Sequence, residues 1–160
     1  TNMRDKGVLG RFGIDYMSSK TKEGWQHYAI EINLRKGGTT HPFLMLQFLT
    51  NGTYYADKSA FVLNDGTLRH YFATDNLQKE KYKGLTPLDL IDIAMCNRLL
   101  YDSSRQTGVM FHMIGALSQY GKLGMVCIGS TKEEAKEFFH KTIEVLDKES
   151  RTIECGNTDK

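Results

Sequence analysis

The stretch that decides the fold runs from residue 29 to residue 42 and reads AIEINLRKGGTTHP. Apolar and polar side chains alternate in its first half, the period-two pattern of a β-strand. We therefore expect a strand over residues 25–35 whose two faces differ in polarity. The polar face is expected to carry Glu31, Asn33 and Arg35. The apolar face is expected to carry Tyr28, Ile30, Ile32 and Leu34.

A second alternating run precedes this strand and extends from Val8 to Tyr16. The polar segment from Ser18 to Gly24 predicts a connecting loop, so the two runs should pair as an antiparallel hairpin. In register, Asp15 would share the polar face with Glu31, and so would Arg11. The hairpin would then gather carboxylate, carboxamide and guanidinium groups on one small surface.

A helix is expected after the break at Gly37-Gly38, because Thr39 or Thr40 can cap it and Pro42 suits its first turn. This helix should end at Asn51-Gly52. The turn signal Asn64-Asp65-Gly66 predicts a further hairpin, with strands at residues 61–63 and 68–73.

The second half of the chain predicts two more helices and two more strands. Thr86 and Asp89 form a capping-box pattern that opens a helix to about Leu100. Strands are expected at residues 109–117 and 123–128, and a helix capped by Ser130 should end near Lys148. Because strands and helices mix without a regular βαβ alternation, the fold class is α+β, with helices on an antiparallel sheet. We expect one domain over residues 1–149 and a flexible tail over 150–160.

Composition narrows the class of protein. The chain has 160 residues, 40% of them hydrophobic and 25% charged, and a net charge of +2. This is the profile of a soluble globular domain, with no electrostatic reason to expect nucleic acid or an anionic membrane as partner. The three cysteines lack metal-ligand spacing, and no apolar run is long enough to span a bilayer. We expect a reducing, cytoplasmic location.

The polar hairpin face has the chemistry of a magnesium site. Asp15 and Glu31 would supply carboxylate oxygens and Asn33 a neutral oxygen, and Mg²⁺ is held by one or two carboxylates together with water and phosphates. Arg35 follows closely enough to clamp a phosphate or acyl phosphate. The competing interpretation is a solvated sheet face with weak surface ion pairs, and from spacing alone it is the more common outcome.

The following segment favours a bound anion. Lys36 adds a cation, Gly37-Gly38 adds flexible backbone amides, and the helix N-terminus at Thr39, Thr40 and His41 adds its dipole. His41 could contact a substrate or cap the helix, and the residues leave both roles open. His112, on a strand between apolar neighbours, is more simply a core histidine.

These motifs resemble the C-terminal metal site of the ATP-grasp ligases. The resemblance lies in GRFGIDY at residues 10–16, in the Glu-x-Asn-x-Arg strand, and in TGVMFH at residues 107–112, over roughly residues 7–147. It is strongest for a peptide-ligase branch related to the pheganomycin ligase, which includes an IQ-motif relative in animals. One departure is Gly13, which stands where some members have an arginine two residues before the aspartate.

The resemblance implies roles for individual residues. Asp15, Glu31 and Asn33 would hold the Mg²⁺ (or Mn²⁺) that bridges the phosphates of ATP. Arg35 would stabilise the acyl phosphate, and Arg11 would be a second catalytic cation. The residues expected to bind the nucleotide phosphates are Lys36, Thr39, Thr40 and His41.

The implied activity is an ATP-dependent joining of a carboxylate to an amine, on small-molecule or peptide substrates, through an acyl phosphate. ATP-grasp sites lie between two subdomains, so we expect the N-terminal half of the same protein as a partner. This chain alone should bind nucleotide weakly and be inactive. The alternatives are a non-catalytic scaffold module and a Mg²⁺–nucleotide sensor.

Overall fold

The computed structural model describes residues 3–156, with backbone only for residue 4 and residues 151–156. The chain divides into two compact units, Thr1–Leu44 and Met45–Lys160. All strand pairs of the two sheets are antiparallel. Together with the helices this makes an α+β fold, which confirms the class expected from the sequence.

The smaller unit consists of a 3-10 turn, a hairpin and the start of a helix. The turn η1 spans Met3–Lys6, and the strands are β1 (Gly13–Thr21) and β2 (Gly24–Asn33). The helix α1 spans Thr40–Thr50, so the helix predicted after Gly37-Gly38 is confirmed. The hairpin forms a two-stranded sheet of its own.

The hairpin is longer at its turn and shorter at its start than the sequence suggested. The expected loop over residues 18–24 is wrong, because strand pairing continues to Thr21 opposite Gly24. The loop was expected because the segment is polar. Both faces of the hairpin are exposed, so polar residues near its turn are compatible with strands. Ser18 and His27 instead make a cross-strand hydrogen bond of 2.7 Å. The expected strand start at Val8 is also wrong, since β1 begins at Gly13.

A β-bulge interrupts the register of the hairpin. Asp15 faces Glu31, whereas the next residue, Tyr16, faces Ala29, so Ile30 is the extra residue on β2. Because an extra residue reverses the alternation beyond it, Tyr28 lies opposite Met17 and shares the face of Asp15. The expectation that Tyr28 lies with Ile32 on the apolar face is therefore wrong.

The larger unit is built on a five-stranded sheet of order β3-β4-β5-β7-β6. The strands are β3 (Thr53–Tyr55), β4 (Ala60–Val62), β5 (Leu68–Gln78), β6 (Gly108–His112) and β7 (Lys122–Gly129). The predicted turn between β4 and β5 is confirmed: Asp65 accepts from the backbone and hydroxyl of Thr67, and Gly66 has a positive φ of 83°.

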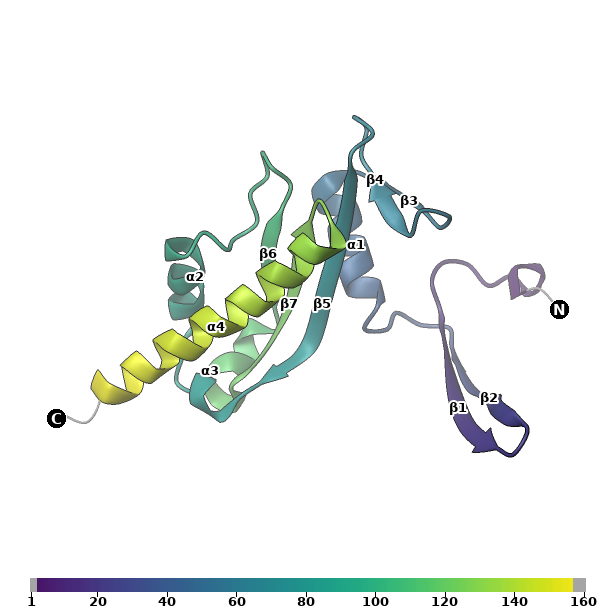
Figure 1. Cartoon of the computed structure of the whole chain (residues 1–160), viewed down its shortest axis with the longest axis horizontal. Helices are drawn as coiled ribbons and strands as arrows, with labels where there is room; N and C mark the ends of the chain where they lie inside the picture. The colour runs from purple at the N-terminus through teal and green to yellow at the C-terminus, as the bar shows by residue number, and fades with distance from the viewer. Residues whose placement is uncertain (1–2, 157–160) are drawn as a thin grey trace. The chain divides into compact units, whose positions relative to one another are not determined.

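Helices cover this sheet and close its core. The α-helices are α2 (Pro87–Cys96), α3 (Leu117–Tyr120) and α4 (Lys132–Gly156), and the 3-10 turns are η2 (Glu80–Tyr82) and η3 (Ile114–Ala116). The long helix α4 packs across β5 and β7 (Figure 1). The first buried cluster is Tyr82, Leu85, Leu90, Leu117, Leu123 and Leu146. The second is Ala94, Leu99, Val109, Met125 and Cys127.

Three helix and strand boundaries differ from the sequence prediction. The capping box of Thr86 and Asp89 is confirmed, but α2 ends at Cys96 because Arg98 takes a positive φ of 53°. The strand expected over residues 109–117 ends at His112, where Met113 also has a positive φ of 56°. The hydroxyl oxygen of Thr131, not that of Ser130, accepts a hydrogen bond from the Glu134 backbone amide in the first turn of α4. That helix continues to Gly156. Among the residues described, no helix combines the length and apolar character needed to cross a bilayer.

Candidate functional site

The hairpin brings the three predicted metal ligands together. Asp15 on β1 is the register partner of Glu31 on β2, and cross-strand partners share a face. Asn33 donates a hydrogen bond of 3.0 Å from Nδ2 to Asp15 Oδ2. This bond uses the amide nitrogen of Asn33. The amide oxygen, which is the atom that would bind a cation, takes no part in it.

The donor set fits Mg²⁺ better than a softer metal. Two carboxylates and one carboxamide oxygen are hard ligands, and an exposed Mg²⁺ keeps several waters or phosphate oxygens. Asp15 and Glu31 are exposed, so the remaining coordination positions would be open to solvent or substrate. Within residues 3–156, no cluster of three or more His, Cys, Asp or Glu side chains could hold a metal on its own. A cation at this site would therefore need Asn33 and water or other oxygen ligands in addition to the two carboxylates.

The segment after β2 is held by bonds within the loop. Arg35 lies beyond the end of β2 at Asn33, so the expectation that it continues the polar face of the strand is wrong. Its guanidinium makes a long contact of 3.5 Å to the carbonyl of Lys36. The Gly37 amide donates to Thr40 Oγ1 at 3.1 Å, and the Thr40 amide donates to the Gly37 carbonyl at 2.9 Å. The Gly37 N–H expected to face an anion is thus engaged, and Thr40 is buried. Thr39 and His41 are exposed at the start of α1.

Arg11 does not follow the alternation of the hairpin. It precedes β1, so the argument that placed it on the polar face with Asp15 was wrong. Its guanidinium instead lies over the ring of Phe43, 3.8 Å from the ring centroid. This is a cation–π contact, which stabilises the position of the arginine without neutralising its charge.

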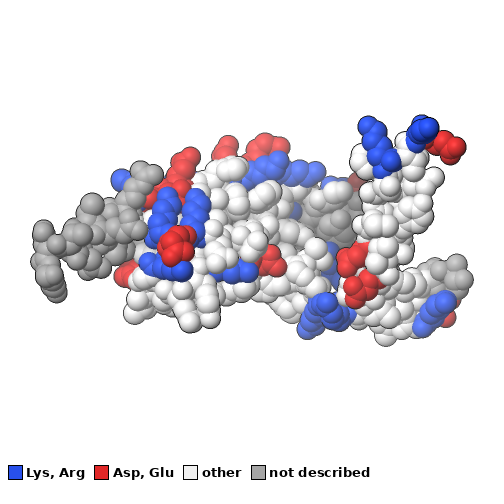
Figure 2. Space-filling model, turned by 90° about the horizontal axis from the view of Figure 1, so that it is seen from below, with Lys and Arg blue, Asp and Glu red and all other residues white. Residues whose placement is uncertain are grey.

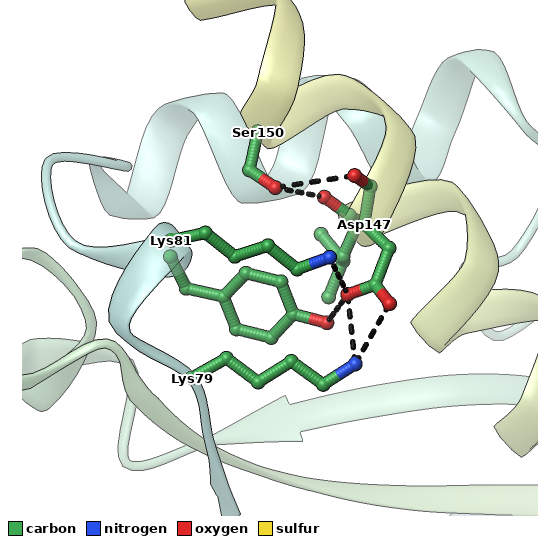
Figure 3. A network of polar contacts seen from close by, with 6 residues as sticks. Lys79, Lys81, Asp147 and Ser150 are labelled. Carbon is green, nitrogen blue, oxygen red and sulfur yellow. Dashed lines mark hydrogen bonds and ion pairs between the residues drawn. The ribbon is translucent and has the colours of Figure 1, made fainter. Parts of the chain in front are cut away.

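A second polar cluster, which the sequence did not indicate, joins η2 to α4. Lys79 Nζ contacts both carboxylate oxygens of Asp147 at 2.8 Å, and Lys81 Nζ lies 3.0 Å from Oδ1 (Figure 3). Tyr82 donates its hydroxyl to the same oxygen at 2.5 Å. Burial alone would raise the pKa of Asp147, but the bonds from Lys79, Tyr82 and Lys81 outweigh it and lower that pKa to about 2. Burial and then the bond to Asp147 raise the pKa of Tyr82.

We assign this cluster to stability rather than to chemistry. Each member is satisfied by another, and the pKa of Asp147 is lowered while that of Tyr82 is raised, so both shifts lead away from neutral pH. On the face shown in Figure 2, lysines and arginines are interspersed with carboxylates, and no extended patch of one sign stands out there.

His112 lies beside an irregular part of the larger sheet. It is the register partner of Gly124, and a Cβ at Gly124 would collide with the His112 ring. Across β7 from His112, the register of β5 shifts between Thr74 and Leu77, so Asp75 and Asn76 form a bulge opposite Gly124. The strand expected over residues 68–73 is therefore too short, because β5 continues through this bulge to Gln78. Bulges are frequent next to functional sites, although packing alone also explains this one.

Two comparisons with known proteins found similarity to this chain. The family model of the PGM1 C-terminal domain matches residues 89–142, from α2 into α4. The L-propargylglycine–L-glutamate ligase of Streptantibioticus cattleyicolor is 28% identical over 129 residues, which cover 81% of this chain and 26% of that ligase. The two matches support a relationship to the ATP-grasp ligases. The chain thus spans about a quarter of the length of the curated relative it matches. No solved structure matches the chain significantly.

Proposed function

We propose that this chain is the metal-binding, C-terminal part of an ATP-dependent ligase that joins a carboxylate to an amine. The observation that carries the proposal is the pairing of Asp15 with Glu31, with Asn33 hydrogen-bonded to Asp15. Similarity to an amino-acid ligase supports the same class of reaction.

The proposed reaction has two steps. A carboxylate oxygen attacks the γ-phosphorus of ATP, which forms an acyl phosphate and releases ADP. An amine then attacks the acyl carbon, loses a proton and displaces inorganic phosphate, which leaves an amide. A magnesium ion, when bound, would neutralise charge on the transferred phosphoryl group.

The chain's own residues would hold and orient the phosphates. Asp15, Glu31 and Asn33 would hold Mg²⁺, and Arg35 would face the reacting phosphoryl oxygens with its planar guanidinium. Arg11, fixed over Phe43, would supply a second positive charge to the hairpin. The phosphate oxygens would be contacted by Lys36, Thr39, Thr40 and His41. Thr40 and Gly37 would first break the hydrogen bonds that they make to each other and form bonds to phosphate instead.

The rest of the ligase must supply what the hairpin lacks. An exposed two-stranded sheet offers no enclosed pocket for adenine, and water around it would weaken every electrostatic interaction with phosphate. We therefore propose that an N-terminal nucleotide-binding subdomain covers this hairpin. The 160-residue chain alone should turn over no ATP above background.

The test is ADP release by the full-length protein with Mg²⁺, amino acids as carboxylate and amine, and ATP. We expect Glu31→Gln to reduce turnover by at least about 100-fold, because it removes one of the two carboxylates proposed to hold Mg²⁺ beside the reacting phosphate. Glu23→Gln, at the turn of the same hairpin, should leave turnover unchanged. Equal activity of the Glu31 variant would overturn the assignment. Mg²⁺-dependent nucleotide binding without turnover in the unaltered protein would favour the sensor, and absence of both would favour a scaffold.

A further inference from the structure

A pocket in the larger unit is lined by both aromatic and positively charged residues. It has a volume of about 180 Å³ and lies where β3, β4, β5 and the beginning of α4 meet. Tyr54, Phe61 and Phe72 contribute aromatic surface, and Arg69, Lys132 and Lys136 contribute positive charge. Of the side chains that the structure describes, no aspartate or glutamate lines it. Figure 1 shows the N-terminal end of α4 beside β5, with β4 next to it.

Arg69 brings a positive charge to the pocket, and Asp65, which does not line the pocket, is near enough to interact with that charge. Its Nε donates to the carbonyl of Gln106 at 3.1 Å, and Nη2 donates to the carbonyl of Arg105 at 3.0 Å. Its Nη1 donates to the carbonyl of Leu68 at 2.7 Å and to Thr67 Oγ1 at 3.4 Å. All four acceptors are neutral oxygens, so the guanidinium is oriented while its charge remains.

Lys132 and Lys136 add two charges from one face of α4. They are four residues apart, which places them one above the other on a helix. Neither ammonium group forms an ion pair with a carboxylate among the side chains that the structure describes. Three cations among the lining residues, with no carboxylate among them, make the pocket attractive to an anion.

The aromatic wall limits the size and character of the ligand. Phe61 is 2% exposed and packs against Tyr54 at 5.5 Å between ring centroids, and Phe72 packs against Phe139 at 4.8 Å. These contacts fix a preformed apolar surface. An apolar cavity of roughly 150 Å³ is known to hold one benzene ring, so a pocket of this volume suits a single ring or a branched aliphatic chain.

We propose that this pocket binds a small organic anion, with a single ring or branched aliphatic body on the aromatic wall and a carboxylate or phosphate group facing Arg69, Lys132 and Lys136. The proposal uses the larger unit alone. It is independent of the hairpin site, so either can fail without the other.

His70 gives the pocket a built-in reporter. It lines the pocket, and burial followed by the charge of Lys132 lowers its pKa, while Glu133 acts in the opposite direction. Arg69 and Lys136 are the other charged groups at the pocket. A bound anion would raise the pKa of His70. Binding should therefore strengthen as pH falls through the pKa that His70 has in the anion-bound protein.

The experiment titrates the 160-residue chain with benzoate, phenyl phosphate, benzyl alcohol and inorganic phosphate, followed by NMR. We expect benzoate or phenyl phosphate to shift the signals of His70 and of the pocket residues with saturation, and to raise the pKa of His70. Benzyl alcohol tests the need for charge, and inorganic phosphate tests the need for a ring. Whichever of benzoate and phenyl phosphate binds more tightly identifies the anionic group.

Lysine-to-glutamine variants locate the site. Lys132→Gln and Lys136→Gln should each weaken binding by about three-fold, and the double variant by about ten-fold. Lys141→Gln, further along α4 and outside the pocket, should leave binding unchanged. The proposal is overturned if benzyl alcohol binds as tightly as benzoate, if inorganic phosphate binds as tightly as phenyl phosphate, if neither organic anion binds, or if the Lys141 variant loses as much affinity as the other two.

Discussion

The hairpin that carries the predicted metal site and the five-stranded sheet differ in where their apolar side chains lie. On the hairpin, Trp25 and Ile30 are each 63% exposed and Ile32 is 49% exposed. In the larger sheet, Val126 and Ile128 of β7 are fully buried. The larger unit therefore contains its own core, whereas the hairpin presents large apolar side chains on a sheet that has only two strands. An isolated two-stranded sheet is marginally stable in water, so the element that carries the predicted metal site has less packing to stabilise it than the larger sheet has.

Hydrogen exchange should show the largest difference between the two units. Amides of β7 should exchange only through global unfolding, with a free energy of about 5 to 15 kcal/mol. Amides of β1 and β2 should exchange at least about 1,000-fold faster, because a solvated ladder opens locally. Equal protection in β2 and β7 would contradict the contrast.

The next largest difference between the two units should appear in the free energy of unfolding after a matched pair of isoleucine substitutions. Ile128→Ala removes a fully buried side chain and should lower the free energy of unfolding by about 2 to 5 kcal/mol. Ile32→Ala removes a half-exposed side chain and should cost less than about 0.5 kcal/mol. Urea denaturation of the 160-residue chain measures both, and similar losses would show that the hairpin has a core of its own.

The ion cluster at Asp147 should have a smaller effect that depends on pH. The folded-state pKa of Asp147 is lowered from 3.8 to about 2, so its contribution is present above pH 4 and is lost as pH falls towards 2. Asp147→Asn should cost about 1 to 2 kcal/mol at pH 7, a value reduced by screening because 28% of the side chain is exposed. Chemical denaturation at pH 7 and near pH 2 measures this difference. A constant difference across this range would exclude Asp147 as its source.

The smallest effect on stability should come from the matching substitution in the hairpin. Glu31→Gln replaces an exposed carboxylate that no hydrogen bond or ion pair to a described residue holds in place. The free energy of unfolding should change by less than about 0.5 kcal/mol. Thermal denaturation of this variant beside Asp147→Asn measures the comparison. A large loss at Glu31 would mean that the residue is structural.

The sequence predicted most elements because their local signals are strong. The turn at Asp65 and the capping box at Thr86 each depend on side chains that bond to neighbouring backbone, and both were confirmed. Boundaries were missed where backbone conformation decided them, as at Arg98 and Met113. No sequence pattern predicts a positive φ at an arginine or a methionine, because these residues rarely adopt one.

The candidate site was predicted in part for a similar reason. Period-two alternation in a hairpin assumed to be in register predicted that Asp15 shares a face with Glu31, and this holds because both residues lie on the same side of the bulge. The same rule failed for Tyr28, beyond the bulge, and for Arg11, before the strand begins. The Asp147 cluster was invisible because its partners are 68 residues apart in the chain. Only the tertiary structure could bring them together.

The central claim is that Asp15, Glu31 and Asn33 form one cation site, and paramagnetic NMR tests it most directly. Mn²⁺ added with ATP to the labelled chain should broaden first the signals of these residues, including the side-chain amide of Asn33. Excess Mg²⁺ should reverse the broadening, and Glu31→Gln should abolish it while Glu23→Gln does not. Broadening that begins elsewhere, or that survives in the Glu31 variant, would contradict the account.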